Sequence, residues 1–88
     1  HGITTSLAHE LGPRNIRINA IAPGPTDTEA TRAVVDDNIM QSILATMPIK
    51  RMGITGDMVG PLLFLLSDRA AWITGQVLNV DGGQIMRV

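Results

Sequence analysis

The apolar positions near the start of the chain have the three- and four-residue spacing of a helix. They are Ile3, Leu7, Ala8 and Leu11. Gly12 and Pro13 follow directly, as residues that end helices do. The pattern predicts an amphipathic helix over residues 2–11.

The next apolar pattern is that of a strand over residues 16–22. Its alternate positions are apolar, and Ile21 on the opposite side is apolar as well, which predicts a strand buried on both faces. The strand ends at Pro23-Gly24-Pro25, a loop in which glycine permits close approach of another molecule. Open α/β sheets bind ligands where a buried strand ends in such a loop before a helix, so this loop is the candidate site.

Three more helices are predicted in the middle of the chain. The first reaches about Val35 and can be capped by Thr26, Asp27 or Thr28. The second ends at Pro48, and its apolar stripe is Ile39, Met40, Ile43, Leu44 and Met47. The third, with Thr55 as its N-cap, is apolar almost all round and contains Pro61, which predicts a kink or a late start.

A short strand over residues 76–80 and a turn at Asp81-Gly82-Gly83 follow. The connection between the two strands is long, as a parallel pair requires. Two parallel strands cannot cover helices this apolar. The predicted fold class is therefore α/β, with these residues as the C-terminal portion of a doubly wound parallel sheet that is incomplete on its own.

Composition excludes several classes of function. The chain has 88 residues, no cysteine and a net charge of −1, so nothing attracts it to nucleic acid or to an anionic membrane surface. Its longest apolar run is only residues 62–66, which is too short to cross a bilayer. No metal site is predicted, since cysteines are absent and no two histidines have ligand spacing. We expect a cytoplasmic protein.

Two motifs resemble the C-terminal part of the short-chain dehydrogenase/reductase family, which has an NAD(P)-binding Rossmann fold. One is Asn19-Ala20-Ile21-Ala22-Pro23-Gly24 with Thr28 four residues after the glycine, and the other is residues 74–83, Thr-Gly-Gln-Val-Leu-Asn-Val-Asp-Gly-Gly. Arg51 and Asp57 also match a family pattern, although a solvated arginine and an acid near a helix start explain them more simply.

The resemblance implies a function for each part of the chain. Cofactor-binding residues would be Pro23, Gly24, Thr26 and Thr28, with the backbone of Thr26 on the nicotinamide carboxamide and Thr28 on the carboxamide or a phosphate. Residues 26–54 would form a mobile substrate lid. The last strand and the helix before it would take part in subunit contacts of a homo-oligomer. NAD or NADP would be the cofactor and a small alcohol or ketone the substrate.

The family's catalytic tyrosine and lysine are not expected in this chain. The sequence contains no tyrosine at all, and the family's Tyr-x-x-x-Lys would lie upstream of His1. The chain also begins inside a helical pattern, so we expect residues 1–88 to be a single partial domain without catalytic residues and without activity alone. The alternative is a non-catalytic association module or an inactive remnant.

Overall fold

The computed structural model describes residues 2–86, which fold into helices and two short strands. Helix α1 (Gly2–Leu11) and the 3₁₀ turn η1 (Gly12–Arg14) precede strand β1 (Ala20–Pro23). Helices α2 (Glu29–Val34), α3 (Asp37–Ala45) and α4 (Thr55–Leu66) come next, and η2 (Asp68–Ala70) leads to strand β2 (Val77–Val80). All the predicted helices and strands are present.

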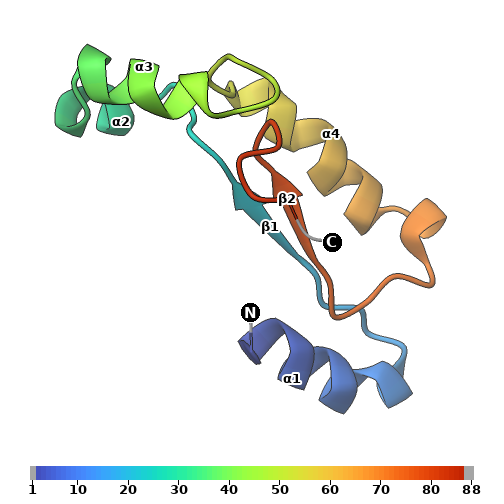
Figure 1. Cartoon of the computed structure of the whole chain (residues 1–88). Helices are drawn as coiled ribbons and strands as arrows, with labels where there is room; N and C mark the ends of the chain where they lie inside the picture. The colour runs from blue at the N-terminus through green and yellow to red at the C-terminus, as the bar shows by residue number, and fades with distance from the viewer. Residues whose placement is uncertain (1, 87–88) are drawn as a thin grey trace.

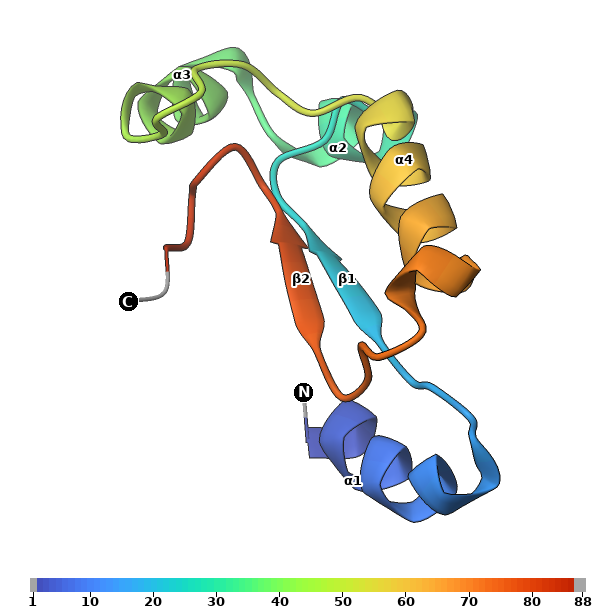
Figure 2. The same ribbon diagram turned by 90° about the vertical axis from the view of Figure 1, so that its right-hand side faces the viewer.

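The two strands pair in parallel. Ala20 lies opposite Val77 and Pro23 opposite Val80. Helix α4 runs beside both strands, whereas α2 and α3 lie beyond their carboxyl ends and α1 lies near their amino ends (Figures 1 and 2). This arrangement confirms the α/β class and the parallel order, and it places the Pro-Gly loop and the α2–α3 region at the same end of the sheet.

Strand β1 is shorter and more open than the sequence predicted. It begins at Ala20 rather than residue 16, and none of its residues is buried. The predicted burial on both faces is wrong for this chain, because no helix of residues 2–86 other than α4 runs along the strands (Figures 1 and 2). Before the ladder begins, the N–H of Ile18 donates to Thr74 Oγ1 at 3.0 Å, and Ile18 O accepts from the N–H of Gly75 at 2.7 Å.

Arg17 joins β1 to the end of α4, a role that the sequence did not suggest. Its guanidinium donates to the carbonyls of Leu65 at 2.8 Å, Ser67 at 3.3 Å and Ile73 at 3.4 Å. The carbonyls at a helix C-terminus lack intrahelical partners, and a cation is favoured there. Arg17 therefore ties the last turn of α4 to the entry of β1.

Helix α4 begins earlier than a start at Pro61 would allow. Its N-cap is Ile54 and Thr55 is its first residue, so both the predicted Thr55 cap and the late start are wrong. The Asp57 carboxylate accepts from the N–H of Ile54 at 2.8 Å, a contact that fixes the helix start although isoleucine has no capping oxygen. Pro61 lies inside the helix and removes one backbone hydrogen bond.

Few side chains are buried. Among residues 2–86, the buried apolar residues are Ala8, Met40, Met47, Leu65 and Ala70. The accessible surface is 6618 Å², against about 5,000 Å² for a compact protein of this mass. The radius of gyration is 15.4 Å, against about 12 Å for a compact domain of this length. These residues therefore do not close a core by themselves.

Candidate functional site

The candidate site begins where β1 ends. Pro23 is the last residue of β1, and the N–H of Gly24 continues the ladder by donating to Val80 O at 3.1 Å. The four predicted residues Pro23, Gly24, Thr26 and Thr28 follow one another from this strand end to the start of α2. The structure thus places them together at the carboxyl edge of the sheet, where such folds bind ligands.

Gly24 is needed for packing within the chain. A Cβ at this position would lie 2.6 Å from Asp81 Cβ and 2.7 Å from Asp81 Cα, which is closer than two non-bonded carbon atoms can approach. The close approach that the structure contains is therefore between the ends of β1 and β2. A close approach by a cofactor at Gly24 remains a prediction.

Thr26 has free backbone groups. It forms an isolated parallel bridge with Gly53, in which the N–H of Gly53 donates to Pro25 O at 2.8 Å and Gly53 O accepts from the N–H of Asp27 at 2.8 Å. In a parallel bridge these two bonds use the neighbours of Thr26 rather than its own peptide groups. Within residues 2–86, the N–H and the C=O of Thr26 accordingly have no hydrogen-bond partner. One donor and one acceptor are left available on the side away from Gly53.

Thr28 caps helix α2 and is one of the three residues that the sequence predicted as possible caps. Its hydroxyl accepts from the N–H of Thr31 at 3.2 Å and lies 3.0 Å from Thr31 Oγ1. Thr26 uses its own hydroxyl to donate to Gly24 O at 2.9 Å. Both side chains therefore shape the loop, in addition to any contact with a ligand.

Arg51 and Asp57 form a two-pronged ion pair beside this loop. Arg51 Nη1 lies 2.8 Å from Asp57 Oδ2, and Arg51 Nη2 lies 3.1 Å from Asp57 Oδ1. Hydrogen bonds from Arg51 and from the N–H of Ile54 lower the pKa of Asp57 to about 2. Asp57 also raises the pKa of Arg51. The sequence indicated either a family pattern or, more simply, a solvated arginine and an acid near a helix start. It did not indicate that the two side chains pair with each other.

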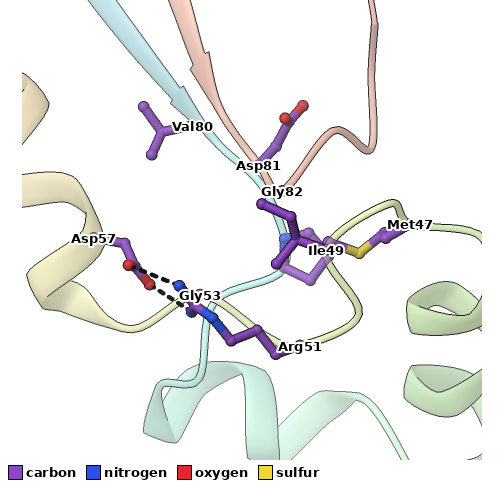
Figure 3. Close-up of a pocket in the computed structure, with 9 residues that line it drawn as sticks. Met47, Ile49, Arg51, Gly53, Asp57, Val80, Asp81 and Gly82 are labelled. Carbon is purple, nitrogen blue, oxygen red and sulfur yellow. Dashed lines mark hydrogen bonds and ion pairs between the residues drawn. The ribbon is translucent and has the colours of Figure 1, made fainter.

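A pocket of about 190 Å³ lies at this ion pair (Figure 3). Its lining residues are Pro25, Met47, Ile49, Arg51, Gly53, Asp57, Val80, Asp81 and Gly82. The pocket joins the 47–53 connector to the carboxyl end of β2. Arg51 of the connector and Asp57 of α4, which both line the pocket, are paired with each other, as the dashed lines of Figure 3 mark.

The turn after β2 holds the segment that follows α3. The N–H of Ile49 donates to Gly82 O at 3.0 Å, and a Cβ on Gly82 would lie 2.9 Å from Met47 Cε. A Cβ on Gly83 would lie 2.8 Å from Pro48 Cγ, and both glycines have positive φ. The glycine pair was predicted as a turn, but its close packing against residues 47–49 could not be inferred from local sequence.

The other chemical possibilities are limited. Among residues 2–86 there is no group of three or more histidine, cysteine, aspartate or glutamate side chains that could hold a metal ion. None of the helices in that range is long and apolar enough to cross a membrane. The N–H and C=O of Thr26 are one donor and one acceptor, which is the combination that complements an amide.

Comparison with known proteins identifies what this chain resembles. A family model described as enoyl-(acyl carrier protein) reductase matches residues 1–84. An uncharacterized oxidoreductase of Mycobacterium tuberculosis is 60% identical over 87 residues, which are 99% of this chain and 35% of that protein. The chain thus spans about a third of the length of this relative.

Solved structures match the fold at similar coverage. A 4-hydroxyisoleucine dehydrogenase mutant complexed with NADH and succinate superposes with a TM-score of 0.87 and 37% identity, covering 94% of this chain and 35% of that one. A short-chain type dehydrogenase/reductase from Mycobacterium ulcerans superposes with a TM-score of 0.88 and 37% identity, covering 94% of this chain and 30% of that one.

Proposed function

Because the chain belongs to the short-chain dehydrogenase/reductase family, we propose that it is the C-terminal part of an NAD(P)-dependent oxidoreductase. The complete enzyme would transfer hydride between the nicotinamide and a small alcohol or carbonyl substrate. This chain would supply the loop on the nicotinamide side and the substrate lid. The matches to oxidoreductases over nearly all of this chain support the proposal.

The free backbone groups of Thr26 are the observation that carries the proposal. A carboxamide has one acceptor oxygen and an NH₂ donor, and the unpartnered N–H and C=O of Thr26 complement both. The residues present therefore fit a nicotinamide. When bound, the cofactor supplies the hydride donor or acceptor, and the role of this chain is to hold the carboxamide and so orient the ring.

The remaining site residues support that loop. Pro23 ends the strand, and Gly24 lets Asp81 pack against the loop. The Thr28 hydroxyl, which caps α2, can also contact the carboxamide or a phosphate, since a hydroxyl has one donor hydrogen and two acceptor lone pairs. We assign the four residues to cofactor binding and none of this chain's residues to catalysis.

Residues 26–54 are proposed as the substrate lid. The Thr26–Gly53 bridge joins the two ends of this segment to each other, and the hydrogen bond from Ile49 to Gly82 ties the segment to the turn after β2. The helices between these ties, α2 and α3, lie beyond the strand ends (Figure 1). A segment held in this way can move as a unit over a ligand at the sheet edge.

The proposal is tested by titrating the complete protein with NADH and with NADPH, followed by assays with a panel of secondary alcohols and ketones. We expect saturable binding of one dinucleotide and turnover of at least one alcohol or ketone. Absence of saturable binding of either dinucleotide would contradict the proposal.

A second candidate, a non-catalytic association module, is favoured by the uncovered apolar residues of α4. Leu66 is 71% exposed, and Val59, Leu62, Leu63 and Phe64 are exposed as well. Two results together would favour this function over the oxidoreductase. The isolated chain would sediment as a stable oligomer, and the complete protein would bind no dinucleotide.

A further inference from the structure

Gly53 is what holds the candidate carboxamide-binding residue in place. The two backbone hydrogen bonds of Gly53, each 2.8 Å long, reach the residues on either side of Thr26. The direction of the Thr26 N–H and C=O therefore depends on the position of the Gly53 peptide groups. Within the described residues, no backbone hydrogen bond other than these two joins residues 25–27 to another segment.

Asp57 in turn fixes the chain on both sides of Gly53. After Gly53 in the sequence, the Asp57 carboxylate accepts a hydrogen bond from the N–H of Ile54 at 2.8 Å. Before Gly53, the same carboxylate accepts hydrogen bonds from both terminal nitrogens of Arg51, whose Nη1 also donates to Met52 O at 3.0 Å. One carboxylate thus connects residues 51 to 54 to the first turn of α4, the longest helix of the chain.

We propose that Asp57, with Arg51 as its partner, is a positioning residue for the cofactor. Asp57 holds Gly53, and Gly53 holds the Thr26 backbone in the orientation that recognises a nicotinamide carboxamide. The inference rests on the proposed function and adds to it a residue outside the loop that contacts the ligand. Groups that orient a contacting residue in this way are as necessary for a precise site as the contacts themselves.

The exposure of the ion pair distinguishes this role from simple stabilisation. The side chains of Arg51 and Asp57 are 57% and 29% exposed, and ion pairs that reach solvent contribute little to global stability. Loss of the pair should therefore leave the protein folded while it loosens residues 51–54. The consequence is expected in ligand affinity, and only for the part of the ligand that Thr26 contacts.

The experiment compares two probes on the complete oxidoreductase. NADH carries the carboxamide and ADP-ribose lacks the whole nicotinamide; for an NADP-preferring protein the pair is NADPH and 2′-phospho-ADP-ribose. In Asp57→Ala we expect the Kd for the reduced dinucleotide to rise about fivefold or more. The Kd for the probe without nicotinamide should not change.

Two further variants keep the test decisive. Arg51→Met should shift the dinucleotide Kd in the same direction by less, because Asp57 still accepts from Ile54, and it serves in place of Asp57→Ala if that variant does not fold. Ser67→Ala removes the hydrogen bond from Ser67 Oγ to Phe64 O at the opposite end of α4, and it should change neither Kd.

The outcomes separate the two proposals. An unmodified protein that binds neither probe would overturn the proposed function. An unmodified protein that prefers the dinucleotide, together with an Asp57→Ala variant that keeps the same ratio between the two probes, would overturn the positioning role alone. Equal affinity of the unmodified protein for both probes would also overturn it, because carboxamide recognition would then be absent.

Discussion

At the scale of single residues, Gly24 decides how closely the ends of the two strands approach. Its backbone does not need a positive φ, and its requirement is space, since a Cβ would overlap Asp81. Any larger residue must push β1 and β2 apart at the site. Substitutions at Gly24 are therefore expected to disturb this packing, in addition to any effect on a ligand at the loop.

We predict that Gly24→Ala destabilises the complete protein by about 1–3 kcal/mol, the usual cost of overpacking. Gly60→Ala is the matched control, because Gly60 lies inside α4 with no atom within 4 Å of the added carbon. The control should stabilise by about 0.5–1 kcal/mol, since alanine favours helix interiors. Chemical denaturation measures both; equal effects of the two changes would refute the assigned contact.

Asp57 carries a pH dependence whose sign follows from its lowered pKa. Arg51 first and the N–H of Ile54 second lower the pKa from 3.8 to about 2. The stability that the pair contributes is therefore fully present above about pH 4 and is lost as the pH falls toward 2. Carboxyl NMR shifts should show Asp57 titrating near pH 2, and near-normal titration in the unmodified protein would argue against the ion pair.

Replacing Arg51, the partner of Asp57, should raise the pKa of Asp57. In Arg51→Met the pKa of Asp57 should rise toward its ordinary value but not reach it, because the Ile54 N–H still favours the ionised carboxylate. A pKa of Asp57 that does not move in this variant would mean that Arg51 is not its main stabilising group.

At the scale of elements, α4 is a long apolar helix that tolerates an internal proline. Pro61 leaves the carbonyl of Asp57 without its intrahelical partner. We predict that Pro61→Ala stabilises the complete protein by up to about 3 kcal/mol, the difference in helix propensity between the two residues. A thermal midpoint that stays the same or falls would show that Pro61 makes a packing contribution of equal size.

Arg17 links the end of α4 to the entry of β1 through its hydrogen bonds. We predict that Arg17→Lys destabilises the complete protein by about 1–2 kcal/mol, because a lysine ammonium cannot reproduce the fork that reaches three carbonyls. The measurement is denaturant unfolding against Arg14→Lys, a change of the same chemistry at an exposed position. Equal stability of the two variants would contradict the prediction.

The helices and strands could be predicted from local sequence patterns, whereas the contacts between them could not. Helical spacing and the two strand patterns predicted α1 and the parallel pair. Thr26, Asp27 or Thr28 was expected to cap α2, and Thr28 does so. The start of α4 was misplaced because Asp57 acts as a cap from inside the helix. The Arg17 and Asp57 contacts bring together residues whose closeness depends on the folded backbone.

The place of the Pro-Gly loop in the fold was predicted, whereas the contacts that shape the loop were not. The Pro-Gly loop after a strand indicated a ligand site, and the resemblance named Thr26. The free peptide groups of Thr26 follow from its bridge to Gly53, 27 positions later in the chain. A pairing between such distant residues has no local sequence signal, and the same holds for the approach of Asp81 to Gly24.

At the scale of the whole molecule, the described residues resemble one side of a larger domain. The sheet has two strands, the strand residues are only partly covered, and the shape extends over 48 × 24 × 23 Å. Apolar faces that would be covered in a complete doubly wound sheet remain accessible to water. Stability and ligand binding should therefore belong to the complete protein.

We predict that the 88-residue chain alone neither binds NADH measurably nor catalyses turnover. Binding is best followed by the fluorescence of NADH itself. Trp72 would report poorly, because it is 99% exposed on the loop that enters β2 at its amino end, whereas the site lies at the carboxyl end. Saturable enhancement of NADH fluorescence by the isolated chain would contradict this prediction.

The measurement that tests the account most directly is hydrogen exchange at the Thr26 amide of the complete protein. Saturating NADH, or NADPH for an NADP-preferring protein, should slow exchange at this amide, because its N–H gains a carboxamide oxygen as acceptor. The corresponding ADP-ribose should leave the exchange rate as it is in the free protein. Unchanged exchange at Thr26 with saturating dinucleotide would contradict the account.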